Sequence, residues 1–191
     1  MKTGRKIIVY VSTSADGYIA RLDGDFSWLD RPRSAGGYGI YAFFRSIDTI
    51  LWGRKTYDLA VSMGGVDPYG LNVKHYVFSH HAPVGQAAGV EFVTESVGAF
   101  AQRLRAFPGK DIWIMGGAGL IATFLDEGAI DEFIINVIPV FIGEGIPLIQ
   151  PRHRLVRLTL LSSRRFSDGV VRLHYRVLPR APESRKGRGS K

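Results

Sequence analysis

The order of strand and helix patterns along the chain predicts an α/β fold with a mainly parallel central sheet. As far as residue 128, short apolar runs alternate with segments of helical periodicity. After residue 128 only strand patterns occur, and the last two flank Ser167-Asp168-Gly169, a typical hairpin turn. Alternating strands and helices build parallel sheets, whereas hairpins build antiparallel pairs, so we expect antiparallel strands at one edge.

In the first half of the chain, β-branched runs indicate strands and spaced aromatic residues indicate helices. The run at residues 6–13 is rich in Ile and Val, and Asp16-Gly17 after it has turn chemistry. Tyr41, Phe44 and Ile47 share one helical face. These patterns predict strands at residues 6–13, 49–52, 74–79 and 89–94, and helices at residues 38–47 and 55–62.

The second half contains two helical patterns before the terminal strands. The amphipathic segment 97–107 ends at Pro108-Gly109, a typical helix stop. Pro139 lies inside the apolar run 131–141 and has no amide hydrogen, so we expect a sheet edge or a bulge near it. These patterns predict helices at residues 97–107 and 120–127, and strands at residues 112–115, 131–141, 155–166 and 170–178.

Length and composition predict a single domain, residues 1–178, with a sizeable core. The chain has 191 residues, of which 46% are hydrophobic. It has no cysteine, which excludes disulfides and thiolate metal sites and makes the reducing cytoplasm the default compartment. No apolar run approaches the roughly 20 residues of a membrane span, and the N-terminal residues lack a signal-peptide pattern.

The net charge of +8 invites a nucleic-acid interpretation, but the location of the charge weakens it. Residues 179–191 contain five basic residues and one acidic residue, and so carry +4, half of the total. This segment has Pro, Gly and Ser and no apolar periodicity, which is typical of a disordered, solvated tail. Binding of RNA or an acidic partner is the less favoured alternative.

A glycine-rich turn between a predicted strand and a predicted helix is the first candidate ligand site. Residues 111–115 resemble a buried strand and lead directly into Gly116-Gly117-Ala118-Gly119. A helix N-terminus offers unpaired backbone N–H groups and a positive dipole end, and glycine lets an anion approach closely. The turn therefore favours a phosphate or dinucleotide. Its G-G-x-G spacing is not the G-x-G-x-x-G fingerprint, and such turns also serve packing alone.

Two further strand ends carry groups suited to phosphate. In Gly53-Arg54-Lys55-Thr56, Arg54 offers a planar fork of donors and Thr56 can cap the helix or bond a phosphate oxygen. The polar Ser79-His80-His81 follows the next strand, and its adjacent histidines point to opposite faces, which disfavours a metal site. A capped helix with a solvated Arg-Lys pair and a plain polar strand end are the alternatives. Together, the three strand ends predict an extended ligand with several phosphates.

Four segments, in order, resemble the dihydrofolate reductase superfamily, in the branch of the riboflavin-biosynthesis reductase, the 5-amino-6-(5-phosphoribosylamino)uracil reductase, and its stand-alone relatives. The segments are Ser14-Ala-Asp-Gly-Tyr-Ile-Ala20, Trp52-Gly-Arg-Lys-Thr-Tyr57, Ile114-Met-Gly-Gly-Ala-Gly119 and Pro139-Val-Phe-Ile-Gly-Glu-Gly-Ile-Pro-Leu148. The resemblance covers about residues 6–178, and the last two segments together are specific to this branch. It implies a three-layer α/β/α fold, NADPH as cofactor, and hydride transfer to a small heterocyclic or carbonyl substrate.

The resemblance also implies a cofactor site, residue by residue. The Gly-Arg-x-Thr turn holds the phosphates, Ser79 lies near the adenosine 2′-phosphate, and Ile19 and Ala20 border the nicotinamide. The Gly116–Gly117 bond, commonly cis in the family, lies against the cofactor. The expected cofactor residues are Ile19, Ala20, Gly53, Arg54, Lys55, Thr56, Ser79, Gly116, Gly117, Ala118, Gly119, Leu120 and Ile121.

The chain departs from the family in ways that narrow its function. Dihydrofolate reductases place an acidic residue early in the helix after the flexible loop, and the aligned Tyr38-Gly-Ile-Tyr41 has no carboxylate. Folate reduction is therefore disfavoured, and the lack of cysteine excludes the zinc deaminase domain that accompanies the riboflavin-pathway reductase. Asp25 or Asp30 would donate a proton if their loop folds inward; otherwise a water would. The expected substrate pocket, which ordinary core packing would also explain, comprises Tyr10, Trp28, Phe43, Phe44 and Met115.

Two functions remain open on the sequence. The first is an NADPH-dependent reductase, and the second is a nucleotide-binding or sensor module of the same fold without turnover. The missing carboxylate favours the second, whereas the combined phosphate motifs fit both. The apolar strand at residues 133–140 and the terminal hairpin would leave an edge or a face that needs cover, so we also expect a homodimer.

Overall fold

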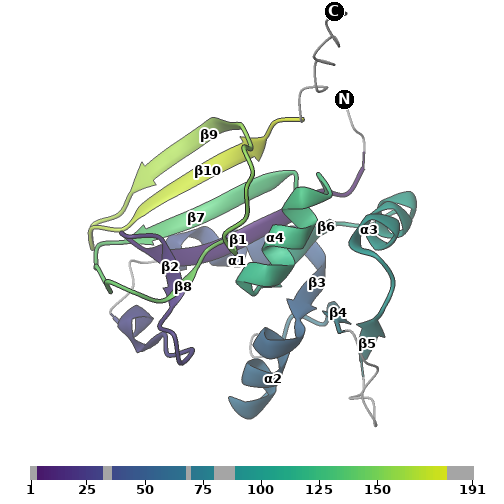
Figure 1. Cartoon of the computed structure of the whole chain (residues 1–191), viewed down its shortest axis with the longest axis horizontal. Helices are drawn as coiled ribbons and strands as arrows, with labels where there is room; N and C mark the ends of the chain where they lie inside the picture. Colours follow the sequence, from purple (N-terminus) through teal and green to yellow (C-terminus); the bar gives the residue numbers. More distant parts are fainter. Residues whose placement is uncertain (1–3, 32–35, 68–69, 80–88, 180–191) are drawn as a thin grey trace, which may run out of the picture.

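The computed structural model describes residues 4–31, 36–67, 70–79 and 89–179, which form a central sheet between two layers of helices (Figure 1). In these residues the sheet has eight strands in the order β5-β4-β3-β6-β1-β7-β10-β9. Neighbours from β5 to β7 are parallel, and β10 is antiparallel to both β7 and β9. The strands are β1 (Ile7–Ser14), β3 (Ile47–Gly53), β4 (Lys74–Phe78), β5 (Val90–Val93), β6 (Asp111–Gly116), β7 (Glu132–Ile138), β9 (Leu158–Arg165) and β10 (Val171–Val177). The predicted mainly parallel α/β sheet with an antiparallel edge is confirmed.

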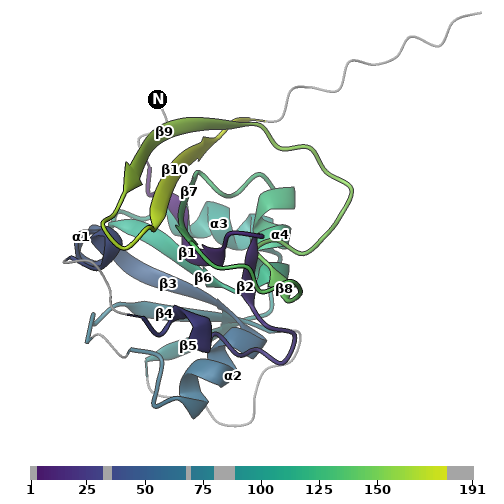
Figure 2. The same cartoon turned by 90° about the vertical axis from the view of Figure 1, so that its left-hand side faces the viewer.

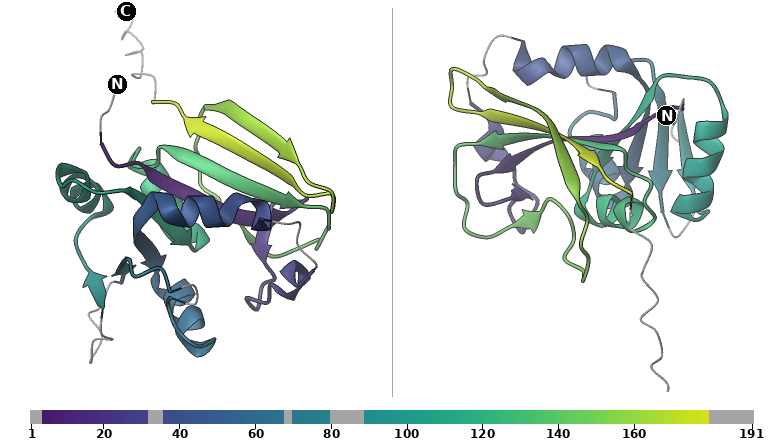
Figure 3. Two further views of the ribbon diagram at one scale, coloured as in Figure 1. Left: turned by 180° about the vertical axis from the view of Figure 1, so that it is seen from behind. Right: turned by 90° about the horizontal axis from the view of Figure 1, so that it is seen from above.

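Two helices cover each face of the sheet, as the views from behind and from above show (Figure 3). The helices α1 (Ile40–Ser46) and α2 (Arg54–Ser62) pack on one face. The helices α3 (Val97–Ala106) and α4 (Ala118–Asp126) pack on the other. The Ser96 hydroxyl accepts a hydrogen bond from the Ala99 amide and so caps α3. The predicted three-layer α/β/α arrangement is therefore present.

Burial on both faces explains why the central strands read as continuous apolar runs. In β1, Ile7 and Val9 face the α3–α4 core, whereas Ile8 and Tyr10 face the α1–α2 core. Successive residues of a strand point to opposite faces, so a strand covered on both sides needs an apolar residue at each position. This pattern fixes β1 in the middle of the sheet, where its carboxyl end reaches the candidate site.

A second, two-stranded sheet is a feature that the sequence did not predict. The short β2 (Tyr18–Ala20) pairs antiparallel with β8 (Ile146–Pro147), and the two lie side by side in Figure 2. The Leu148 amide also donates to the Gly17 carbonyl over 3.1 Å. A side chain on Gly145 would collide with the Ala20 carbonyl oxygen, so glycine is required at this crossing.

The strand predicted over residues 131–141 is shorter than expected and does not lie at an edge of the sheet. The strand β7 ends at Ile138, before Pro139, because proline cannot donate to the ladder. It lies between β1 and β10 rather than at an edge, and β9 forms the edge on that side. The edge on this side therefore belongs to the terminal hairpin, one of the two segments from which the sequence predicted an edge or a face that needs cover.

The helix predicted from residue 38 begins two residues later. Tyr38 and Gly39 have φ values of 59° and 89°, outside the right-handed helical region, and belong to the 3₁₀ turn η2 (Gly37–Gly39). The expected last residue, Ile47, instead begins β3. A second 3₁₀ turn, η1 (Ser27–Leu29), lies in the preceding loop. The predicted tail lies outside the described residues from residue 180 onward.

Candidate functional site

The carboxyl ends of four adjacent strands bring the predicted phosphate-binding segments to one edge of the sheet. The strands β4, β3, β6 and β1 are neighbours in that order, and all four are parallel. Gly53 ends β3, Gly116 ends β6, and Ser79 follows β4. The strand register sets Trp52 opposite Gly116, so the two glycine turns begin at the same level. Ligands of open α/β sheets bind at such an edge.

The two glycine turns are in direct contact. A Cβ atom on Gly53 would lie 3.1 Å from the Gly117 nitrogen and 3.2 Å from the Gly116 carbonyl oxygen. A Cβ atom on Gly117 would lie 3.1 Å from the Thr56 hydroxyl. The Gly116–Gly117 bond is cis, as predicted, and Gly116 has a φ of 127°. At Gly53 backbone therefore meets backbone with little room for a side chain, so the peptide groups of the two turns lie side by side.

Both helices that follow these turns start without a side-chain cap. Gly53 is the N-cap of α2 and Gly117 is the N-cap of α4, and neither glycine can supply a capping oxygen. Thr56, expected as a possible cap, is instead the third residue of α2. The amides of a first helical turn have no partner inside the helix, so two positive helix ends converge on one edge. This arrangement favours an anionic ligand such as a pyrophosphate.

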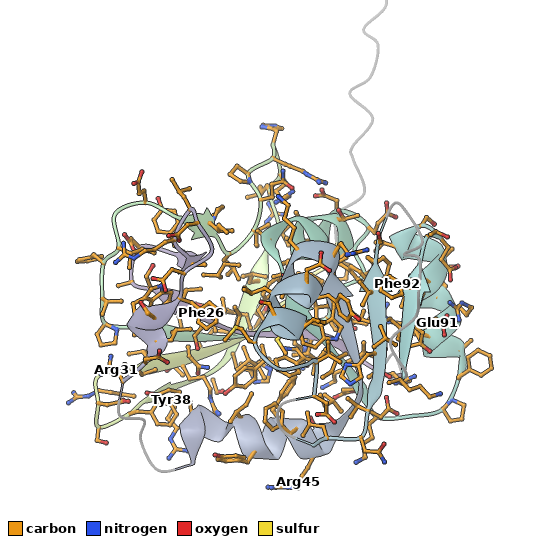
Figure 4. The ribbon with its side chains drawn as sticks, turned by 90° about the horizontal axis from the view of Figure 1, so that it is seen from below. Phe26, Arg31, Tyr38, Arg45, Glu91 and Phe92 are labelled. Carbon is orange, nitrogen blue, oxygen red and sulfur yellow. The ribbon has the colours of Figure 1, made fainter. Side chains whose placement is uncertain are left out.

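Arg54 provides a cation beside the turn. Its Nε donates to both carboxylate oxygens of Asp58, over 2.8 and 2.9 Å, and its guanidinium lies 5.7 Å from the ring of Phe92. Phe92 projects from β5 on the side of α2 (Figure 4). The Arg54 side chain is 43% exposed, so a phosphate could reach it from solvent. Lys55 is exposed, whereas His80 and His81 lie outside the described residues.

The segment from Pro139 to Leu148 connects β2, where the nicotinamide is expected, with the start of α4. Its β8 pairs with β2, which carries Ile19 and Ala20. The Asp16 carboxylate accepts from the Gly143 amide over 2.8 Å, and the Ser14 hydroxyl and these loop amides hold the pKa of Asp16 below its ordinary value. Just beyond the segment, the Gln150 amide donates to the Ala118 carbonyl over 3.2 Å. The expected nicotinamide edge is thereby joined to the start of α4.

The expected substrate residues divide among three places. Tyr10 and Phe43 line a cavity of about 280 Å³ between α1 and the strands β7 and β10. Phe44 packs on Trp113 in the neighbouring core, and Met115 lies against that same core. Trp28 packs elsewhere, in a cluster with Ile138, Phe166, Val170 and Tyr38. Only Tyr10 and Phe43 of the five therefore border the cavity.

The cavity also has polar lining residues that the sequence did not predict as part of a site. Glu132, Arg172 and His174 line it, and Asn136 lies on the same face between Ser12 and Arg172 in register. Polar residues alternate with apolar ones in Arg172-Leu-His-Tyr175, a signal that one face of the last strand is polar. The sequence did not show that this face meets a cavity, because that depends on where α1 crosses the sheet.

The buried carboxylate of Glu132 is paired rather than available as an acid. Burial acts to raise the pKa of Glu132, but bonds from Lys6, at 3.0 Å, and from His174, at 2.9 Å, outweigh it and lower the pKa. Its ordinary value is about 4.3, so the group is ionised at neutral pH. Glu132 therefore holds the cavity floor together and carries no proton to donate.

Neither expected proton donor lies at the cavity. Asp25 accepts from the amide and the hydroxyl of Ser27, and these bonds, with Arg21 nearby, hold the pKa of Asp25 below its ordinary value. A general acid needs a raised pKa, so this environment opposes the expected role. Asp30 is exposed at the end of η1. Arg31 from the same loop bonds the Asp168 carbonyl and lies near Tyr38 (Figure 4).

Neither a metal-binding cluster nor a membrane-spanning helix is found in the described part of the chain. No group of three or more His, Asp and Glu side chains there is placed to hold a metal ion. None of the helices in the same residues is long and apolar enough to cross a membrane.

Comparison with known proteins gives the class and then the family. The structure superposes on a putative riboflavin biosynthesis protein from Shewanella sp. PV-4 with a TM-score of 0.80 and 27% identity, over 91% of this chain and 99% of that one. It also superposes on dihydrofolate reductase from Enterococcus faecalis complexed with NADP(H), with a TM-score of 0.65 and 15% identity, over 90% and 96%. The fold is thus that of the dihydrofolate reductases.

The family model of the RibD C-terminal domain matches residues 5–172, and the chain belongs to this family. The chain is 40% identical over 171 residues to the uncharacterized protein YwjB of Bacillus subtilis (strain 168), covering 90% of this chain and 97% of that protein. The family is that of the riboflavin-pathway reductase, as the sequence resemblance indicated.

Proposed function

We propose that this protein is an NADPH-dependent reductase that transfers a hydride to a small heterocyclic or carbonyl substrate. The contact between the Gly53 turn and the Gly116–Gly117 turn, at adjacent strand ends, carries the proposal. Two uncapped helix starts and Arg54 supply positive potential at one edge, which suits the phosphates of a dinucleotide. The substrate would lie on the α1 face, beside Tyr10 and Phe43.

The cofactor supplies the hydride, and the chain supplies position and shelter. In this proposal, the amides that begin α2 and α4 hold the phosphates, with Arg54, Lys55 and Thr56 beside them. The β2–β8 sheet positions Ile19 and Ala20 along the nicotinamide and excludes water from that edge. With Asp25 ionised, a water molecule is the proton source that we propose.

Replacing Arg54 tests the cofactor site. We expect Arg54→Ala to weaken NADPH binding by about 10- to 100-fold, because a charge-assisted hydrogen bond contributes about 1.5–3 kcal/mol. Titration calorimetry measures the change. Arg103→Ala is the matched control, since Arg103 is equally exposed, pairs with Glu95 and lies over Phe100, but belongs to α3. If Arg54→Ala binds NADPH with the same affinity as wild type, the proposed cofactor site is wrong.

A catalytically silent nucleotide-binding or sensor module is the second candidate. The lowered pKa values of Asp25 and of the paired Glu132 favour this silent module, because neither carboxylate carries a proton to donate at neutral pH. The absorbance of NADPH, followed with aminouracil, pterin and quinone-type compounds, separates the two candidates. Consumption of NADPH with any of these supports the reductase, whereas tight NADPH binding without consumption supports the silent module. Folate reduction stays disfavoured, because α1 contains no carboxylate.

Three smaller proposals accompany the reductase. Residues 1–178 form one domain, the protein works in the cytoplasm, and its partner is a small molecule rather than a nucleic acid. The lack of cysteine supports the second, and the concentration of charge at residues 179–191 supports the third. Salt-sensitive RNA binding that is lost when residues 180–191 are deleted would contradict the third.

We also propose a homodimer formed through β9. This strand lies at the end of the sheet, and it exposes Leu158, Leu160 and Leu161 at 43%, 51% and 37%. An exposed edge strand is a template for pairing with another chain, and contiguous exposed apolar side chains mark interaction sites. We expect light scattering to give twice the 21.1 kDa of one chain for wild type, and one chain for Leu160→Lys. Leu22→Lys, at a position 67% exposed, is the control. A monomeric wild type would contradict the dimer.

A further inference from the structure

A buried histidine is bonded to the residue that precedes the Gly53 turn. His75, on β4, is 7% exposed, and its Nδ1 atom lies 3.1 Å from the indole Nε1 atom of Trp52 on β3. Trp52 is 2% exposed and directly precedes Gly53, the glycine that contacts the Gly116–Gly117 turn. The strand register also pairs Trp52 with Gly116. One side chain therefore joins His75 to the place where the two turns of the proposed cofactor site meet.

The hydrogen bond fixes the protonation state of the imidazole. An indole nitrogen can only donate, so Trp52 donates and the Nδ1 atom of His75 accepts. A neutral imidazole with its proton on Nε2 meets this requirement, whereas an imidazolium carries protons on both ring nitrogens. Protonation would set two N–H groups against each other, and the bond between His75 and Trp52 would be lost.

The surroundings of His75 favour its neutral form. Its neighbours in register are Ile50 on β3 and Val90 on β5, and both belong to the apolar α1–α2 core. Among the described residues, Asp67 is the charged group that acts on the imidazole. Burial lowers the pKa of His75 below its ordinary value of 6.5, and the Asp67 carboxylate opposes this shift without cancelling it. His75 is therefore neutral at neutral pH, as its bond to Trp52 requires.

The direction of the pH effect follows from this lowered pKa. The folded protein binds the extra proton of His75 less readily than the unfolded chain does. The neutral imidazole therefore contributes stability above its ordinary pKa of 6.5, and this contribution is lost as the pH falls through the lowered pKa. The bond to Trp52 is present and lost over the same range, so acid acts locally beside Gly53.

We propose that His75 is a positioning residue for the cofactor turn, which holds Trp52 next to Gly53 while neutral and releases it on protonation, weakening nucleotide binding. The inference rests on the proposed reductase, because it names the regulation of that same cofactor site. The imidazole is buried in the core, so His75 acts through Trp52 rather than by contact with the nucleotide. A fall in pH is the signal to which this device responds.

The indole N–H signals in nuclear magnetic resonance spectra test the first step without any ligand. The chain has three tryptophans, and the spectrum of Trp52→Phe identifies the Trp52 signal. From about pH 8 to about pH 5, where histidine titrates, we expect this signal to shift in wild type and to stay fixed in His75→Asn. The asparagine keeps an acceptor but cannot take up a proton.

Trp113 is the internal control for this titration. Its indole donates to the Tyr10 carbonyl over 3.1 Å, and a carbonyl does not titrate. A Trp52 signal that does not move overturns the proposal. A Trp52 signal that moves only together with the Trp113 signal also overturns it, because the whole core would then respond rather than one hydrogen bond.

Titration calorimetry with NADP⁺ over the same pH range tests the link to the cofactor site. The 2′-phosphate of this ligand itself titrates at about pH 6, so each profile is compared with that of a variant. Below the pKa of His75, we expect wild-type affinity to fall more steeply than that of His75→Asn, by up to about tenfold per pH unit, the limit for one proton. Trp52→Phe, which lacks the indole N–H, is expected to show the shallower profile as well. A slope in wild type equal to that of either variant overturns the proposal.

The two proposals can fail separately. If wild type binds NADP⁺ at neutral pH with the same pH profile as His75→Asn, the reductase stands and the positioning role is wrong. If wild type binds no NADP⁺ at any pH, the proposed reductase is wrong, and the link between His75 and a cofactor falls with it. In that second case the Trp52 signal still decides whether protonation separates the two rings.

Discussion

A single methyl group at Gly53 is expected to weaken NADPH binding by about a hundredfold. The Cβ atom of Gly53→Ala would press on the Gly117 nitrogen and the Gly116 oxygen, at 3.1 and 3.2 Å. These atoms are backbone and cannot rotate away, so the two turns must separate. A displacement of about 1 Å in a binding constellation can cost a factor of about 10². Titration calorimetry with NADPH measures the loss.

The control for this variant is the same change at a position where only the end of a flexible side chain lies close. Gly98 lies in α3, where a Cβ atom would meet only the flexible end of the Glu127 side chain. Alanine also favours a helix interior over glycine, so Gly98→Ala should keep or raise stability with unchanged NADPH affinity. If Gly53→Ala binds NADPH as wild type does, the two turns do not form the cofactor site.

The substitution Phe124→Ala is expected to lower the free energy of unfolding by about 3–5 kcal/mol. Phe124 is completely buried on α4, with its ring 5.3 Å from that of Phe78 on β4. Its removal leaves a cavity beneath the helix that starts at the Gly117 turn. Urea unfolding measures the loss, and a drop of this size is a large share of the 5–15 kcal/mol typical of a domain.

Phe141→Ala provides the contrast, because the Phe141 side chain is 81% exposed. We expect this control to change stability by no more than about 0.5 kcal/mol. Equal stability of the two variants would mean that α4 does not depend on packing against the sheet. If Phe124→Ala loses part of its NADPH affinity and Phe141→Ala does not, α4 positions the Gly116–Gly117 turn.

Most strands were predictable because burial on both faces leaves a clear mark on a sequence. The central strand β1, for example, starts and ends within one residue of its expected bounds, since each of its faces meets a core. The α1 helix was harder, because Tyr38 is aromatic and fits the helical spacing. Its φ of 59° depends on a contact with Phe166 and a bond to Asp168, which are distant in sequence.

The glycine and arginine turns of the candidate site could be found from the sequence, because they are local. Each turn joins a strand to the helix that follows it, so its chemistry stands in a few consecutive residues. The cavity was different. Its polar lining residues Glu132 and His174 are far apart in sequence, and the neighbouring strands β7 and β10 bring them together. No local pattern distinguishes a paired polar residue on a strand from an unpaired one.

The sequence by itself determined the order of strands and helices, the antiparallel edge, and the glycine turns with their cis bond. These follow from periodicity, from turn chemistry, and from motifs that resemble a family. The tertiary structure alone decided that the two turns touch, that β8 pairs with β2, and that the Oδ1 atom of Asn136 is buried without a partner among the described residues. The physical reason is that such contacts depend on the strand order and on sheet register, which join residues distant along the chain.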